Sequence, residues 1–118
     1  MTRRWVVLEH RRGSEVHYDL MVEDGEALVT WQLPSPPAPG VRGVRSFDHR
    51  RRYLDYEGPI GGDRGEVRRW DAGSLDDWVG SPRAARYAAR FRGARLRATL
   101  ELREDERGVL VRLVEAGA

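Results

Sequence analysis

The sequence contains no cysteine, no lysine and no long apolar run. Without cysteine, disulfide bonds and thiolate metal sites are excluded, which agrees with a reducing cytoplasm. The N-terminal segment Met1–Arg4 leads into only four apolar residues before Glu9. A signal-peptide core or a membrane-spanning segment requires a much longer apolar run. We therefore expect a cytoplasmic protein that is neither exported nor inserted into a membrane.

Because lysine is absent, all 21 basic residues are arginine, against 19 carboxylates and a formal net charge of +2. Arginine keeps its charge at any working pH and can bind one phosphate through two donors. Six arginines and no acid lie from Arg83 to Arg97, whereas acids gather near the C-terminus. This pattern predicts a basic face, suited to nucleic acid, beside a more acidic end. The alternative is compositional bias towards arginine, with an ordinary solvated surface.

The length of 118 residues supports a single domain, residues 1–118, with one core. Alternation of apolar and polar residues between turn-forming residues indicates β-strands. The strands predicted in this way cover residues 5–10, 16–22, 27–33, 41–47, 66–70, 86 onwards, 95–103 and 109–114. A turn is predicted at 71–74 and a helical or irregular segment at 74–85. We therefore expect an all-β, mainly antiparallel, β-barrel-like single domain with at most one short helix.

The second predicted strand brings an imidazole and a carboxylate to one face. Because side chains alternate along a strand, His17 and Asp19 lie opposite to its apolar residues. A hairpin loop at 11–15 places His10 across from the start of this strand. Two imidazoles and a carboxylate suit a divalent metal with open coordination positions, and zinc and manganese both fit. The alternative for each histidine is a structural or surface role.

The third histidine, His49, follows another strand-like segment, and Tyr53 comes four residues later. The run Arg50, Arg51 and Arg52 lies between them. Such a charge run is either a solvated surface or, beside a metal site, a guide for a nucleic-acid strand. Both interpretations stay open at this point.

These residues belong to a longer series of motifs. In chain order the series is His10, His-Tyr-Asp-Leu at 17–20, Trp31 with Pro34, Asp48-His49 with Tyr53, Tyr-Glu-Gly-Pro-Ile at 56–60, and Trp-Asp-Ala-Gly at 70–73. From about Trp5 to Gly73 it resembles the 3'-phosphoesterase domain of bacterial DNA ligase D. The chain resembles a divergent, stand-alone relative of that domain.

The resemblance implies a β-barrel-like domain that heals DNA or RNA 3' ends, removing a terminal ribonucleoside or phosphate in a manganese-dependent reaction. It implies that His10, His17 and Asp19 bind the metal, most simply Mn²⁺, with Zn²⁺ or another transition metal as alternatives. It implies that His49 and Tyr53 meet the scissile phosphate, and Asp19 would also hold the attacking water. DNA repair ligases or polymerases are then the expected protein partners.

Three positions depart from the pattern of that domain. Met21, Ser35 and Phe47 stand where the family places an arginine, a lysine and a glutamate. Arg42 or Arg45 is the expected replacement for the missing phosphate donor, because only the position of a guanidinium matters to a phosphate. The leading prediction is a metal-dependent phosphoesterase. The alternatives are a catalytically degenerate nucleic-acid-binding module in DNA repair and a hydrolase of a small phosphoester.

Overall fold

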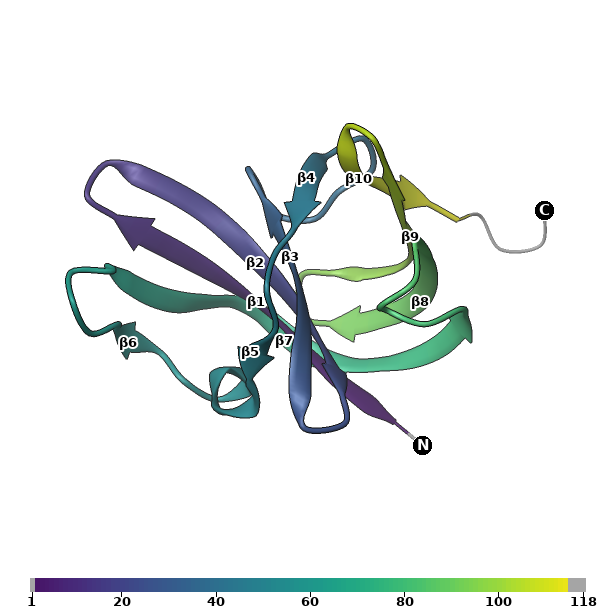
Figure 1. The fold of residues 1–118 in the computed structure, drawn as a ribbon. Helices are drawn as coiled ribbons and strands as arrows, with labels where there is room; N and C mark the ends of the chain where they lie inside the picture. The colour runs from purple at the N-terminus through teal and green to yellow at the C-terminus, as the bar shows by residue number, and fades with distance from the viewer. Residues whose placement is uncertain (1, 115–118) are drawn as a thin grey trace.

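The chain forms a closed antiparallel β-barrel (Figure 1) in a computed structural model that describes residues 2–114. The elements are β1 (Arg3–Arg12), β2 (Glu15–Asp24), β3 (Ala27–Leu33), β4 (Arg42–Arg45), β5 (His49–Arg50), a 3₁₀ helix η1 (Arg51–Leu54), β6 (Gly58–Pro59), β7 (Glu66–Val79), β8 (Arg86–Gly93), β9 (Arg97–Asp105) and β10 (Gly108–Leu113). Within the described residues, eight strands follow the order β1-β2-β3-β4-β10-β9-β8-β7, and β7 pairs with β1 to close the barrel. The predicted all-β, barrel-like fold is confirmed. Met1 and residues 115–118 of the predicted single domain lie outside the described residues.

The barrel interior is filled by buried aromatic and aliphatic side chains. Trp5 and Phe91 meet edge to face, with ring centroids 5.4 Å apart. Trp31 and Tyr87 stack with centroids 6.2 Å apart. All four are at most 1% exposed, so large apolar areas leave water here and stabilise the closed sheet.

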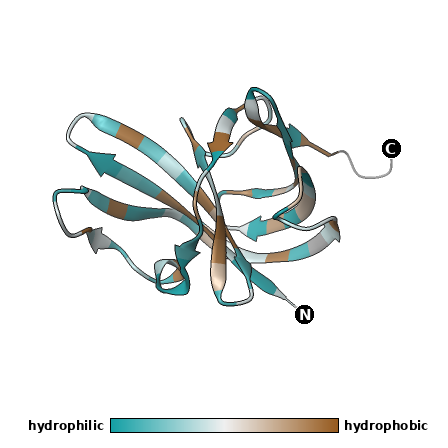
Figure 2. Ribbon diagram, viewed as in Figure 1, coloured by the Kyte–Doolittle hydropathy of each residue, from teal (hydrophilic) through white to brown (hydrophobic). Residues whose placement is uncertain are grey.

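Strands β1, β2 and β3 are covered on both faces. In β1, Trp5 and Val7 point into the barrel, whereas Val6 and Leu8 belong to a second core on its outer side. All four are buried. A continuous apolar run is expected for a strand buried on both faces, and Figure 2 shows hydrophobic colour in the middle of these strands.

The second core lies between the outer face of the barrel and residues 47–65, termed the roof. The roof carries β5, η1 and β6; β5 pairs with β3, and β6 pairs with β7. The second core consists of Val6, Leu8, Met21, Leu28, Leu54 and Val67. This layer positions the candidate site, because the space between roof and barrel opens into a pocket.

Strand β7 overturns two predictions. It runs without a break through the predicted turn at 71–74 and through the first half of the predicted helical or irregular segment, as far as Val79. Asp71 looks like a turn residue, but its carboxylate accepts hydrogen bonds from the backbone N–H groups of Ala72 and residues 94–96. Gly73 lies against β8, where an added Cβ would come within 1.9 Å of a backbone carbonyl oxygen. Contacts with β8 and with the turn after it therefore hold Asp71 and Gly73 in a strand, although both residue types locally favour a turn.

The remaining predicted elements agree in large part. Strand β3 matches the predicted 27–33, and the final hairpin is present as β9 and β10. The predicted strand 41–47 is shorter, because only Arg42–Arg45 forms β4. Within residues 2–114 the one helical element is η1, and no helix there is long and apolar enough to cross a membrane.

The expected acidic end does not form as a separate surface. Glu101, which is 5% exposed, contacts arginines of β8, β9 and β10 at 2.5–3.6 Å. Glu104 pairs with Arg45, and Asp105 pairs with Arg42. These three acids are therefore interleaved with arginines, because the barrel places distant segments side by side; Glu115 lies outside the described residues.

Candidate metal centre

His10, His17 and Asp19 converge on the outer face of the β1–β2 hairpin. His10 and His17 are direct partners in the antiparallel register, and Asp19 lies on the same face two residues along β2. His10 Nδ1 is 3.1 Å from His17 Nε2, which is 3.2 Å from each carboxylate oxygen of Asp19. The predicted convergence is confirmed, and metal binding stays a prediction.

The spacing and chemistry of these three groups fit a divalent transition metal. Donor atoms held about 2.1 Å from one ion, at octahedral to tetrahedral angles, lie roughly 3.0–3.4 Å apart. The two contacts made by His17 Nε2, 3.1 and 3.2 Å, fall within that range, and the donor atoms of all three residues lie within 4.8 Å of one another. Two imidazole nitrogens with one carboxylate suit zinc, manganese and other transition metals. Asp19 is only 4% exposed, so a cation in the cluster would neutralise a carboxylate that is largely removed from water.

The orientation of His10 is fixed from its far side. Its Nε2 lies 2.6 Å from the backbone carbonyl oxygen of Arg64. A carbonyl only accepts hydrogen bonds, so Nε2 carries the proton and Nδ1 presents its lone pair to the cluster. A hydrogen bond of this kind commonly orients a metal-binding histidine.

The turn that supplies this carbonyl is held tightly against β1. Gly65 has a φ of +85°, and an added Cβ would lie 1.9 Å from the carbonyl oxygen of Arg11. Its own carbonyl accepts a 2.8 Å hydrogen bond from the backbone N–H of Ile60. Only glycine fits this position. The glycine-rich sequence at 61–65 is typical of a tight turn, but nothing local indicates its hold on His10.

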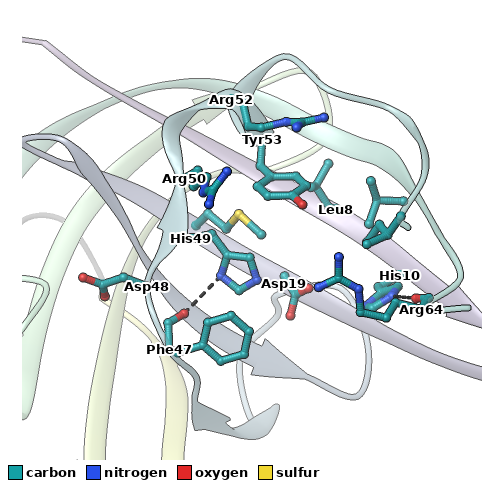
Figure 3. Close-up of a pocket in the computed structure, with 13 residues that line it drawn as sticks. Leu8, His10, Asp19, Phe47, Asp48, His49, Arg50, Arg52, Tyr53 and Arg64 are labelled. Atoms are coloured by element: carbon teal, nitrogen blue, oxygen red, sulfur yellow. Dashed lines mark hydrogen bonds between the residues drawn. The ribbon is translucent and has the colours of Figure 1, made fainter. Parts of the chain in front are cut away.

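His49 enters the pocket from the roof, beside β3. Its Nδ1 lies 2.9 Å from Thr30 Oγ1 and 3.0 Å from the carbonyl oxygen of Phe47. Because the Thr30 hydroxyl donates its hydrogen to the carbonyl of Leu28, its oxygen accepts from His49. Nδ1 therefore carries the proton, and Nε2 points into the pocket (Figure 3).

Burial lowers the pKa of His49 below its ordinary value. The carboxylate of Asp19 and the hydrogen bond to the Phe47 carbonyl oppose this shift in part. The free ring is therefore neutral at pH 7, and Nε2 is a proton acceptor. An anion bound beside the ring would favour the charged form and turn Nε2 into a donor.

The pocket beside the cluster has a volume of about 400 Å³ and is lined by His10, Asp19 and His49 together with Arg50, Arg52 and Arg64 from the roof. Figure 3 shows Arg64 beside His10, on the side away from Asp48. Its Nε donates to the carbonyl of Gly61 at 2.8 Å, which uses one of the five guanidinium donors. Met21, which stands at the position where an arginine is expected, is 1% exposed and lines the pocket. Arg64 therefore supplies a guanidinium to a pocket that lacks the expected arginine.

Tyr53 lies next to His49 in the roof. The two rings meet edge to face with centroids 5.7 Å apart. The guanidinium of Arg52 lies over the rings of Tyr53 and Tyr56, at 5.5 and 4.7 Å. In Figure 3 the hydroxyl oxygen of Tyr53 points towards the interior of the pocket.

Three of the predicted phosphate-binding arginines lie elsewhere. Arg42 and Arg45 form ion pairs with carboxylates of the β9–β10 hairpin, and Arg51 pairs with a carboxylate of β2. None of them lines the pocket. Arg42 and Arg45 therefore do not replace the missing donor, because β4 runs along the barrel between β3 and β10, away from the cluster.

Sequence reasoning missed Arg64 and Thr30. Arg64 was hidden in a glycine-rich segment whose only local signal is a turn. Thr30 had a weak signal, since it is a polar residue within the otherwise apolar strand β3 and is 0% exposed.

The fold and the site define a small closed β-barrel protein with a candidate His-His-Asp metal centre in a cationic pocket on its outer face. No family model matches the sequence. The chain is similar to the multifunctional non-homologous end joining protein LigD of Pseudomonas aeruginosa, with 36% identity over 84 residues. The match covers 63% of this chain and 10% of LigD, so the chain spans about a tenth of that relative. The similarity supports a relationship to LigD and does not specify the LigD domain.

Proposed function

We propose that the protein is a metal-dependent phosphoesterase that acts on nucleic-acid 3' ends, removing a terminal phosphate or ribonucleoside. The observation that carries the proposal is the cluster of His10, His17 and Asp19, of which His10 and Asp19 line one pocket together with His49 and Arg64. The name of LigD places that relative in end joining, and the motif series of this chain resembles the 3'-phosphoesterase domain of DNA ligase D. Nucleic-acid ends are therefore the proposed substrate, and repair ligases or polymerases are candidate partners.

The proposed metal ligands are His10 Nδ1, His17 Nε2 and the Asp19 carboxylate, and the proposed ion is Mn²⁺, with Zn²⁺ as the alternative. When bound, the ion supplies a Lewis acid for the negative charge of the phosphate. His10 Nε2 keeps its proton and goes on donating it to the Arg64 carbonyl oxygen, so the ring keeps its orientation. His17 Nε2 must lose any proton that it shares with its neighbours, which makes metal binding weaker at low pH.

The other pocket residues act on the phosphate itself. The Arg64 guanidinium donates hydrogen bonds to phosphate oxygens, and the anion raises the proton affinity of His49. Water then adds to phosphorus, and the bond from phosphorus to the leaving oxygen breaks. The leaving oxygen is the 3' oxygen of the strand when a phosphate is removed, and the 5' oxygen of the terminal ribonucleoside when a ribonucleoside is removed. One proton of the water stays on the product phosphate, and the other replaces the proton that His49 gives up. The leaving oxygen takes the proton from His49 Nε2, a transfer suited to a group that titrates near neutral pH. Tyr53 donates its hydroxyl to another phosphate oxygen.

Two alternatives make different predictions in the same assay. A nucleic-acid-binding module without catalysis would show salt-sensitive binding to DNA and no turnover. A hydrolase of a small phosphoester would turn over p-nitrophenyl phosphate and show no affinity for DNA.

The test is incubation with Mn²⁺ and a primer-template that carries a 3'-phosphate or a 3'-terminal ribonucleotide. We expect conversion to a 3'-hydroxyl by the wild type and no conversion by His17→Ala or Asp19→Asn. Loss of a ligand should weaken Mn²⁺ binding, measured by calorimetry, by more than the roughly 10–100-fold typical of outer-shell changes.

The matched control is Asp76→Asn. Asp76 is an exposed carboxylate of β7 that pairs with Arg92, and it does not line the pocket. This variant should keep wild-type turnover and Mn²⁺ affinity. Unchanged Mn²⁺ affinity in Asp19→Asn would refute the ligand assignment, and absence of turnover with Mn²⁺ bound would refute the enzymatic proposal.

A further inference from the structure

Phe47 is an aromatic side chain that the fold leaves open at the edge of the pocket. It is 75% exposed. Among the exposed large apolar side chains of residues 2–114, it is the one that lines the pocket. An exposed phenylalanine forfeits the free energy of burial, so packing within the barrel or the roof does not account for it.

The ring is nevertheless held in a defined position. One face stacks on His49, with ring centroids 4.7 Å apart and planes inclined by 16°. The backbone carbonyl of the same residue accepts the hydrogen bond from His49 Nδ1. Figure 3 shows the two rings side by side at the pocket. Phe47 is thus a pre-positioned aromatic surface next to the groups proposed to bind phosphate.

We propose that Phe47 is a stacking platform for the terminal nucleobase of a strand whose 3' phosphate lies in the pocket. This inference rests on the proposed function and adds a recognition element for the base. Every nucleobase has a flat aromatic face, so a single ring recognises a strand end without sequence preference. The terminal base is joined to its 3' phosphate through one sugar. A single nucleotide can therefore place its phosphate in the pocket and its base on Phe47.

The chemistry around Phe47 favours a nucleobase over a protein partner. A stable protein interface requires an apolar centre supplied by many residues. The residues that follow Phe47 and line the pocket with it, Asp48, His49 and Arg50, are polar. The apolar lining residues Leu8, Met21 and Val67 are at most 2% exposed and offer little surface to a partner. One exposed phenylalanine ring in a pocket that is also lined by arginines matches the combination of stacking and cationic groups that binds single-stranded nucleic acid.

The experiment measures binding in EDTA, so that turnover plays no part. The probes are 5'-labelled oligodeoxynucleotides with a 3'-phosphate, whose terminal nucleotide carries either adenine or no base. By fluorescence anisotropy at low salt, the wild type should bind the adenine probe roughly 5- to 150-fold more tightly than the abasic probe. This ratio should fall to about one in Phe47→Ala and be kept in Phe47→Trp.

The control is Trp78→Ala, which removes another exposed aromatic ring, 55% exposed and outside the pocket, and should keep the wild-type ratio. Equal wild-type affinity for the two probes, or no binding of either, would overturn the inference. It would also be overturned if Phe47→Ala weakened both probes equally, because Phe47 would then act only through His49.

The result separates this inference from the proposed function. Base-dependent binding without turnover in the Mn²⁺ assay would refute the enzymatic proposal and leave the platform standing. Turnover with base-independent binding would do the reverse.

Discussion

Replacing Asp71 with alanine should destabilise the barrel more than any change to an exposed carboxylate. The Asp71 carboxylate is 6% exposed and accepts four backbone hydrogen bonds of 2.7–3.1 Å. Three of the donors, at residues 94–96, belong to the turn that joins β8 to β9. Of these, the N–H of Leu96 belongs to a buried residue, and it loses its partner without gaining water.

The expected cost follows from these contacts. One buried N–H left without a partner costs about 1–3 kcal/mol. The loss of the other charge-assisted bonds is partly offset by water, because Ala94 and Arg95 are exposed, and adds roughly 1–2 kcal/mol. We therefore expect the free energy of unfolding to fall by about 2–5 kcal/mol, a large part of the 5–15 kcal/mol typical of a domain.

Urea unfolding followed by tryptophan fluorescence measures this change. The control is Asp76→Ala on the same strand, whose exposed ion pair with Arg92 should contribute less than about 1 kcal/mol. An Asp71→Ala cost as small as that of the control would contradict the reasoning.

The contribution of Asp71 should also depend on pH. Burial raises the pKa of its carboxyl, but the four backbone N–H groups outweigh burial and hold the pKa below the ordinary 3.8. A carboxyl whose pKa is lowered by folding stabilises the folded state above its unfolded pKa. The difference between wild type and Asp71→Ala should thus stay constant from neutral pH down to about pH 5 and shrink as the pH falls below 3.8.

Further predictions concern the pocket. Arg64→Ala should raise the KM for a 3'-phosphorylated primer roughly 10- to 150-fold, because charge-assisted hydrogen bonds to the phosphate are lost, and Arg64→Lys should recover part of this loss. The free energy of unfolding should stay the same in Arg64→Ala, because His10 is held by the backbone carbonyl of this residue and not by its side chain. An NMR titration should find the pKa of His49 below 6.5. The contribution of the neutral His49 ring to the free energy of unfolding should be present above pH 6.5 and be lost as the pH falls through the pKa of the folded state. Thr30→Val keeps the side-chain volume and should cost about 1–2 kcal/mol of stability, with the tautomer of His49 less strictly fixed in ¹⁵N spectra.

The sequence predicted those parts of the site that local alternation determines. His17 and Asp19 share a face because they are two residues apart on one strand, and a short turn brings His10 opposite. The register His10 to His17 follows from the same hairpin. These relations need only the period of a strand and a short connection.

The rest depends on contacts between segments that are distant in the chain. Arg64 reaches the pocket only because the turn at 61–65 rests on β1, and Arg42 leaves it only because β4 pairs with β10. The strand character of Asp71 depends on a turn more than twenty residues later. No local sequence pattern encodes such contacts. From the sequence alone, a glycine-rich segment or an arginine is therefore equally compatible with a turn, a phosphate donor or a solvated loop.

The separation of roof and barrel has a consequence for how this protein can evolve. Among the described roof residues, only Leu54 is a buried apolar side chain, whereas the barrel strands supply nearly all of the two cores. Exchanges at Phe47 or Arg64, the residues proposed to contact the substrate, are therefore expected to change the folding free energy little. Substitutions in the roof can therefore change the substrate preference during evolution. The three proposed metal ligands lie on barrel strands, where substitutions are tolerated far less.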